Sequence, residues 1–361
     1  MPTVPLPHDP LTPAGFALIV SGLFALCLAL ALIGHWLALR LRPLWHWLER
    51  RHGELTGRLP ATANPLLRLP IRLLQRSLAE LAMLIAAGLV LLATCAVFIE
   101  LLEEVIEPER LAQLDRAVFA HLQARRQPWL DAVMVAITEL GGVWVTLPLV
   151  LAVAGGLWAT GRRAAAAYWI GAQLASRLSV VVLKATLGRD RPIDLYHGWE
   201  AYSFPSGHAT TAMVTYGLLW VLLGQGRGWL ARCALLAGAA MLIGLIGASR
   251  LYLGVHWLSD VIAGFALGLA WVTLLALAYR LFHGATEAGG KPAARLAPLV
   301  LAVIAIAWGW RCWQEFPHLL QHYRPAGADV QAGAESCSWS RSCRFSTLPL
   351  AWRGSGSRLA V

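Results

Sequence analysis

Long apolar runs constrain this chain more than any other feature of its sequence. A helix needs about 20 consecutive apolar residues to cross a hydrocarbon layer of about 30 Å. Of the 361 residues, 58% are hydrophobic and only 14% are charged, whereas soluble domains carry about 25% charged residues. Because lipid cannot satisfy backbone hydrogen bonds and the runs lack two-residue alternation, they predict an all-α polytopic membrane helical bundle. We expect eight spans: 14–39, 79–101, 132–159, 164–183, 209–224, 233–249, 257–282 and 296–313.

The basic residues are unevenly distributed along the chain. The formal net charge of +10 would by itself suit a nucleic-acid ligand. Residues 1–13, however, hold no Lys or Arg, and the basic residues gather in alternate connections, as the positive-inside rule describes. This alternation predicts an external N-terminus, a cytoplasmic 40–77 segment and no nucleic-acid partner. The arginines of that segment are Arg40, Arg42, Arg50, Arg51, Arg58, Arg68, Arg72 and Arg76.

The predicted spans divide the chain into four segments. An N-terminal transmembrane helix and the basic loop occupy 1–78, the core occupies 79–282, an additional transmembrane helix occupies 283–313, and an external tail occupies 314–361. The tail is rich in Ser, Gly and Arg without periodicity, which predicts disorder.

Two features are expected on the outer side of the membrane. Residues 108–128 have apolar positions at spacings of three and four but are too polar to cross, which predicts a helix on the outer surface. The tail carries Cys337 and Cys343. An oxidising compartment would permit a disulfide between them, but the sequence leaves this pairing open.

One short polar stretch between two apolar runs suggests most of the chemistry. It reads SRLYLGVHWLSD over residues 249–260 and places His256 and Asp260 four positions apart. If the second run is helical, these side chains share one face of its first turns. A carboxylate there accepts the proton of one imidazole nitrogen and leaves the other nitrogen free to attack. The spacing predicts a nucleophile and its orienting carboxylate, although a purely structural contact would have the same spacing.

A second group of polar residues falls at the same predicted helix ends and suits an anionic ligand. Three fixed cations match a phosphoryl group, whose charge spreads over its equatorial oxygens in the transition state. The start of the apolar helix near residue 207 adds free backbone N–H groups and a positive dipole end. Taken singly, the basic residues also fit ordinary snorkelling at the membrane interface. Together the group predicts a phosphate site made of Lys184, Arg191, Ser206, Gly207 and Arg250.

The two histidines near these clusters differ in their neighbours. Asp260 is placed to orient His256, whereas no Asp or Glu lies within four residues of His208. His208 is therefore the expected general acid, which protonates the leaving oxygen and later deprotonates water. The predicted catalytic residues are His256, His208 and Asp260, acting through a phosphohistidine. No carboxylate cluster suits a divalent cation, so we expect neither a metal nor a cofactor.

Two charged residues lie inside predicted spans. Glu139 is about eight residues from the outer end of its span, and Arg177 lies seven residues before Lys184. Antiparallel neighbouring helices would bring both to a depth of about 10 Å. Because isolated intramembrane charges are costly and usually pair, we expect a Glu139–Arg177 contact that supports the site from beneath.

The three polar clusters together resemble a known signature. In chain order they read Lys184-x6-Arg191-Pro192, Pro205-Ser206-Gly207-His208 and Ser249-Arg250-x5-His256-x3-Asp260. This pattern looks like the full three-part signature of the type 2 phosphatidic acid phosphatase family, over about residues 79–282. The resemblance implies a six-helix core shared with vanadium-dependent haloperoxidases and acid phosphatases. It also implies phosphate binding by the five residues above, His208 as the acid, and His256 as the nucleophile held by Asp260.

A site at the outer ends of membrane helices favours a lipid phosphate as substrate, with membrane lipids around it and no obligate protein partner. The resembled family implies four substrate classes: undecaprenyl pyrophosphate, phosphatidylglycerol phosphate, phosphatidic acid and lipid A phosphates. An external site suits the recycling of undecaprenyl pyrophosphate, so we expect an undecaprenyl-diphosphatase-like hydrolase in a bacterial inner membrane. A phosphotransferase would use the same phosphohistidine with a lipid acceptor. A transporter would place its charges near the midplane, whereas here they collect at one set of helix ends.

Overall fold

Helices form all the regular structure in the described part of the chain. The computed structural model describes residues 13–57, 76–107, 111–193, 195–196, 198–283 and 292–323. The α-helices are α1 (Pro13–Thr56), α3 (Leu78–Ile106), α4 (Leu111–Gln123), α5 (Pro128–Glu139), α6 (Val143–Ala159), α7 (Arg163–Leu187), α8 (Gly207–Leu223), α9 (Trp229–Tyr252), α10 (Leu258–His283) and α11 (Pro292–His322). A short 3-10 helix, η1 (Gly198–Ala201), precedes α8. The predicted all-α class is confirmed.

Within these ranges, six helical segments are long and apolar enough to cross a membrane. They are Leu78–Ile106, Pro128–Ala159, Arg163–Leu187, Trp229–Tyr252, Leu258–His283 and Arg295–His322. These segments coincide with six of the eight predicted spans, so the protein is an integral membrane protein. The predicted span 209–224 forms α8, a shorter apolar helix of 17 residues. The predicted span 14–39 lies within α1, which is 44 residues long.

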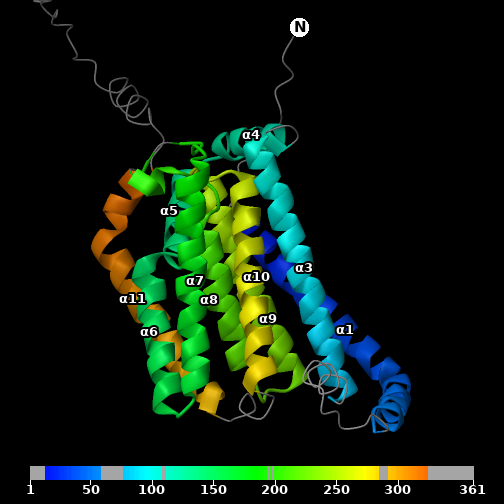
Figure 1. Cartoon of the computed structure of the whole chain (residues 1–361). Helices are drawn as coiled ribbons and strands as arrows, with labels where there is room; N and C mark the ends of the chain where they lie inside the picture. Colours follow the sequence, from blue (N-terminus) through cyan, green and yellow to red (C-terminus); the bar gives the residue numbers. More distant parts are fainter. Residues whose placement is uncertain are drawn as a thin grey trace, which may run out of the picture.

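The helices form a bundle whose middle consists of α7, α8, α9 and α10 (Figure 1). On its flanks, α3 packs on α10, α1 packs on α9, and α11 packs on α5 and α6. The α4 helix lies across the end of the bundle at the top of Figure 1, and it is the helix predicted over 108–128. The largest core cluster joins α6, α7, α8 and α9 through buried residues that include Leu149, Trp169, Tyr216 and Ile246.

The apolar run 132–159 was predicted as one span but consists of two helices. The α5 helix ends at Glu139, and α6 begins after Gly141 and Gly142. A glycine is needed at 141, because a Cβ there would lie 2.7 Å from Ile246 Cγ2 and 3.4 Å from His208 Cδ2. The break therefore lets another helix and a site histidine approach the backbone closely.

Two helices extend beyond the spans predicted from the sequence. The first span was expected to end at 39, and α1 continues into the basic segment 40–77 as far as Thr56. The last span was expected to end at 313, but α11 continues to His322, and Tyr323 follows it. Packing of its C-terminal turns explains the extension, because Leu319 and Tyr323 are buried with Leu130 and Val135 of α5. The rest of the predicted tail, with Cys337 and Cys343, lies outside the described residues.

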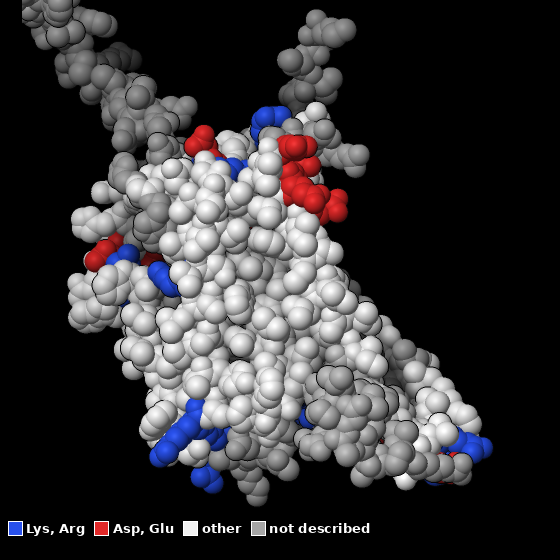
Figure 2. Space-filling model, in the orientation of Figure 1, with Lys and Arg blue, Asp and Glu red and all other residues white. Residues whose placement is uncertain are grey.

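Charge is separated along the length of the bundle. Figure 2 shows basic side chains at the lower end and acidic side chains beside the upper end of α3. The basic residues at the lower helix ends and connections include Arg162, Arg163 and Arg227, and the last turns of α3 carry Glu100, Glu103 and Glu104. This separation matches the alternation seen in the sequence.

Candidate active site

The candidate site lies where two helices end and two others begin. Lys184 is in the last turn of α7 and Arg250 is in the last turn of α9, while α8 begins at Gly207 and α10 carries Asp260 in its first turn. The connection from α9 to α10 depends on Gly254, whose φ is +74°. A Cβ there would lie 2.6 Å from Ile193 Cδ1 and 2.9 Å from Gln123 Nε2, so only glycine fits this turn.

His256 and Asp260 form the contact that their spacing predicted. His256 Nδ1 lies 3.4 Å from Asp260 Oδ2, and both side chains are buried. The same carboxylate oxygen accepts a hydrogen bond from the backbone N–H of Trp257 at 2.9 Å. The other oxygen, Oδ1, accepts one from Arg189 Nη1 at 2.6 Å. Asp260 is therefore held on both sides, and the second imidazole nitrogen of His256 faces away from it.

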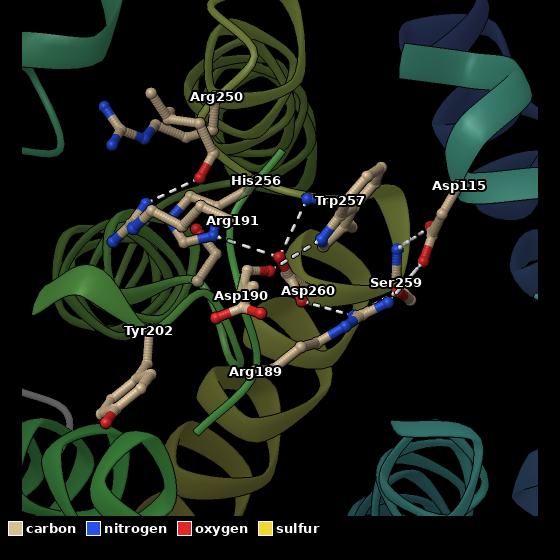
Figure 3. A network of polar contacts seen from close by, with 12 residues as sticks. Asp115, Arg189, Asp190, Arg191, Tyr202, Arg250, His256, Trp257, Ser259 and Asp260 are labelled. Carbon is tan, nitrogen blue, oxygen red and sulfur yellow. Dashed lines mark hydrogen bonds and ion pairs between the residues drawn. The ribbon is translucent and has the colours of Figure 1, made fainter. Parts of the chain in front are cut away.

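Arg189 connects this pair to the helix that lies across the end of the bundle (Figure 3). Arg189 Nη2 donates to Asp115 Oδ2 of α4 at 2.8 Å, and Asp115 is only 3% exposed. Asp115 also accepts hydrogen bonds from the backbone N–H of Ser259 at 2.9 Å and from its hydroxyl at 2.5 Å. Neither Asp115 nor Arg189 was among the predicted site residues. The one feature of the sequence that could have pointed to Arg189 is its position, two residues before Arg191.

Two of the predicted phosphate-binding cations lie beside the histidine. Arg191 Nη1 is 3.2 Å from His256 Nε2, the nitrogen that Asp260 leaves free. Arg191 also donates to the carbonyl oxygens of Val255 at 2.7 Å and Glu200 at 2.7 Å. Lys184 is buried, and its Nζ donates to the carbonyl of Tyr202 at 2.6 Å. Backbone carbonyls thus fix both cations without neutralising them.

Arg250, the third cation, is held by three hydroxyl groups. Its Nη1 donates to Thr138 Oγ1 at 2.9 Å and to the Tyr323 hydroxyl at 3.1 Å. Its Nη2 donates to the Tyr196 hydroxyl at 3.0 Å, and the two tyrosine hydroxyls are 3.1 Å apart. Arg250 is 1% exposed, and its Nε is buried without a partner in the described structure. The sequence analysis missed Thr138, Tyr196 and Tyr323, which come from three distant parts of the chain.

The start of α8 brings backbone and hydroxyl donors to the same place. Ser206 is fully buried, its Oγ has no hydrogen-bond partner among the described residues, and its N–H donates to the Asp260 carbonyl at 3.0 Å. Gly207 follows as the first residue of the helix, and the ring of His208 lies beside Gly141. An unpartnered buried hydroxyl costs free energy, which a bound anion would recover.

The electrostatic surroundings keep the imidazole of His256 neutral. Burial lowers its pKa well below the usual 6.5, and the charges of Arg191, Arg250, Lys184 and His208 lower it further. Burial, followed by the charge of Arg250, also lowers the pKa of Arg191 to about 10. A neutral imidazole among cations retains the lone pair needed for attack on an electrophile.

The predicted Glu139–Arg177 contact is wrong. Glu139 Oε2 instead accepts a hydrogen bond from Arg311 Nε of α11 at 2.9 Å, while the Arg177 side chain is exposed on α7. The reason is the end of α5 at Glu139, which turns this residue toward α11. Arg311 also pairs with Glu315 at 2.8 Å. Elsewhere in the described ranges, no three His, Cys, Asp or Glu side chains gather so as to hold a metal ion.

Comparison with known proteins gives consistent matches. The family model described as PAP2 superfamily matches residues 165–283. Phosphatidylglycerophosphatase B of Bacillus subtilis is 33% identical over 183 residues, which are 48% of this chain and 86% of that protein. Lipid A 1-phosphatase of Rhizobium johnstonii is 35% identical over 124 residues, 30% of this chain and 46% of that protein. Undecaprenyl-diphosphatase of Sulfolobus acidocaldarius is 38% identical over 76 residues, 21% of this chain and 32% of that protein.

Proposed function

Since this chain belongs to the PAP2 superfamily, we propose that it is a membrane lipid phosphatase that transfers the phosphoryl group of its substrate to His256 before water releases it. The proposed mechanism rests on one imidazole nitrogen of His256 that Asp260 leaves free and that lies among basic side chains. His256 Nε2 points away from Asp260 and lies 3.2 Å from Arg191 Nη1. A phosphoryl group bound by Arg191 would therefore lie within reach of the nucleophile.

In the first step, the Nε2–P bond forms while the bond from phosphorus to the leaving oxygen breaks. Arg191 must release the Nε2 lone pair and bind a phosphoryl oxygen instead. His208 donates a proton to the leaving oxygen. Burial, followed by the charges of Arg250 and Arg191, lowers the pKa of His208 well below 6.5 in this structure, so its proton enters with the anionic substrate, whose charge favours the protonated imidazole. Lys184, Arg250, the Ser206 hydroxyl and the N–H groups at the start of α8 stabilise the equatorial oxygens. Asp260 stabilises the positive charge that develops on the imidazole.

In the second step, water replaces the histidine on phosphorus. His208, now neutral, accepts a proton from the water as its oxygen attacks. The Nε2–P bond breaks, inorganic phosphate leaves, and His256 returns to its neutral form. Every charge in both steps is balanced by a side chain of this site, so we propose hydrolysis without a metal ion.

For the substrate we propose undecaprenyl pyrophosphate, hydrolysed to undecaprenyl phosphate. The site lies at the end of the bundle opposite the basic connections, which suits the extracytoplasmic face of a bacterial inner membrane. Phosphatidylglycerol phosphate is the second candidate, because the relative matched over 86% of its length is named for that activity. Lipid A phosphates, phosphatidic acid and transfer to a second lipid are the other outcomes that an assay should separate.

The test is phosphate release from each lipid in detergent, with chelator present and with or without an acceptor lipid. His256→Ala should lose at least about 10³-fold in kcat, and His208→Ala about 10²-fold to 10⁴-fold. His121→Ala is the matched control, since His121 lies exposed on α4 and contacts only Arg125 among the described polar groups. An acid-labile phosphoprotein should form in the intact enzyme and be absent in His256→Ala.

Several outcomes would contradict parts of this proposal. Activity that chelator abolishes would exclude the metal-independent mechanism. Full activity in His256→Ala would exclude this nucleophile. Release from phosphatidylglycerol phosphate but not from undecaprenyl pyrophosphate would keep the mechanism and replace the substrate.

A further inference from the structure

A second cavity lies at the basic end of the bundle, away from the catalytic residues. Its volume is about 680 Å³, within the range of about 300–1,000 Å³ that is usual for ligand sites. It is formed by the first half of α3, the start of α7, and the ends of α8 and α10. None of the predicted catalytic or phosphate-binding residues lines it.

The cavity has a polar rim and an apolar interior. Arg162 at the α6–α7 connection, Arg232 on α9 and Arg280 near the end of α10 line the rim. Val90 and Leu269 are among the apolar lining residues. Arg280 follows Leu269 by 11 positions, which is about 16 Å along a helix. The cavity therefore extends from the depth of lipid headgroups into the depth of acyl chains.

The charge of the rim has no acidic counterpart in the cavity. Three arginines line it, whereas no Asp or Glu does. Arg232 and Arg280 form no ion pair with any carboxylate in the described ranges. Among the described residues that line the cavity, these two arginines have no carboxylate counterion, so a bound anion is the complementary partner.

The aromatic residues of the rim also suit a lipid headgroup. Tyr168, Trp220 and Tyr279 line the cavity beside the arginines, and Tyr and Trp are enriched at headgroup depth. Basic pockets between membrane helices on the positive-inside face bind anionic headgroups. A soluble anion would use the rim and leave the apolar interior open, whereas a phospholipid would fill both parts.

We propose that this cavity binds one anionic phospholipid as a resident lipid. Its phosphate contacts Arg232 and Arg280, with Arg162 nearby, and an acyl chain fills the space between α3 and the ends of α8 and α10. Because this space separates the first half of α3 from α7 and α8, the lipid stabilises the attachment of α3 to the bundle. The site is separate from the proposed catalytic site, so its test does not depend on phosphatase activity.

The experiment is native mass spectrometry of the full chain in neutral detergent, titrated with phosphatidylglycerol or with phosphatidylcholine of the same acyl chains. One phosphatidylglycerol should be retained in preference to phosphatidylcholine and should raise Tm. The double variant Arg232→Gln/Arg280→Gln should bind phosphatidylglycerol about thirty-fold more weakly, at about one kcal/mol for each arginine. Arg50→Gln/Arg51→Gln is the matched control, because both arginines are exposed on α1 and neither lines the cavity.

A second variant keeps the test decisive if the arginine variant does not fold. Ala87→Trp fills the cavity from α3 without changing charge and should lower retention of phosphatidylglycerol. Equal retention of both lipids by the intact protein, or retention unchanged in Ala87→Trp, would overturn the proposal. Displacement of the lipid by glycerol phosphate would show that the site recognises a soluble phosphate instead.

Discussion

At the scale of single residues, the two nitrogens of His256 have different partners. Nδ1 faces the Asp260 carboxylate at 3.4 Å, and Nε2 faces the Arg191 guanidinium at 3.2 Å. The carboxylate sets the tautomer, while burial and the surrounding cations oppose protonation. Neutral hydroxyl groups likewise orient Arg250, and they leave its positive charge in place. The site thus places a neutral imidazole, the proposed nucleophile, beside the guanidinium groups of Arg191 and Arg250.

The lowered pKa of His256 predicts activity in acid. Attack requires the neutral imidazole, and the pKa in the folded protein lies well below 6.5. His256 therefore stays neutral when the pH is lowered to 6.5. The acid limb of kcat/KM should appear only as the pH falls through the lowered pKa of His256. The measurement is kcat/KM against pH, corrected for the separately measured ionisation of the substrate. A corrected acid limb at an ordinary imidazole pKa would contradict this assignment.

Tyr323 should act as a positioning residue for Arg250. In Tyr323→Phe, Arg250 Nη1 loses one of its two hydroxyl partners, and a hydrogen bond to a charged group contributes about 1.5–3 kcal/mol. We expect KM to rise by about tenfold or more while kcat changes less, because Arg250 is a proposed phosphate-binding residue. Tyr196→Phe should act similarly. The double variant should cost less than the sum of both, because the two hydroxyls also contact each other. A lower Tm with unchanged kcat and KM would show that these tyrosines have a purely structural role.

At the scale of elements, three helices outside the matched range 165–283 reach the site, and α5 does so through Thr138, which accepts a hydrogen bond from Arg250. The α4 helix contributes Asp115, which holds Arg189 and Ser259 behind Asp260. The α11 helix is followed by Tyr323, which holds Arg250, and it carries Arg311, which pairs with Glu139. Trp308 Nε1 also donates to the Ala136 carbonyl at 2.8 Å, which ties α11 to α5. These helices support Arg250 and the His256–Asp260 pair from different elements of the bundle.

Removing the α4 contact should impair the chemical step more than binding. Asp115→Asn weakens the ion pair with Arg189 and with it the orientation of Asp260. We expect kcat to fall about tenfold to a hundredfold with little change in KM, because the proposed phosphate-binding cations keep their partners. The measurement is kcat and KM of the variant in detergent. The control is Arg116→Gln, at an exposed position of α4. A rise in KM with normal kcat would assign α4 to substrate binding instead.

At the scale of the whole molecule, the site lies at the end of the bundle that α4 covers (Figure 1), and basic side chains gather at the other end (Figure 2). Such separation orients a membrane protein, because loops rich in Lys and Arg stay in the cytoplasm. The same separation places the proposed catalytic site and the proposed lipid site in different leaflets. A substrate phosphate and a resident anionic lipid would then not compete for one position.

This orientation can be tested by labelling in intact cells. In a cysteine-free background, Arg116→Cys on α4 should react with a membrane-impermeant thiol reagent. Arg227→Cys, between α8 and α9, should react only after the membrane is permeabilised. Both positions are exposed. The reverse pattern would place the site on the cytoplasmic face and remove the argument for an external substrate.

Features that depend on neighbouring residues could be predicted from the sequence alone. Apolar runs of sufficient length can form only helices in lipid, so the bundle and most of its spans were predictable. The four-residue spacing of His256 and Asp260 fixes their contact through helix geometry alone. The three polar clusters were likewise readable, because each is short and falls at the end of an apolar run.

Contacts between distant elements could not be predicted in this way and became known from the folded structure. Asp115 and Ser259 are 144 positions apart, and Arg250 and Tyr323 are 73 positions apart. Glu139 and Arg311 are 172 positions apart, and the sequence analysis gave Glu139 the wrong partner. No local spacing encodes such pairs, because they depend on which helices pack together and on how each is rotated. The break at Gly141 and the extension of α11 set those rotations, and through them the surroundings of His208 and Arg250.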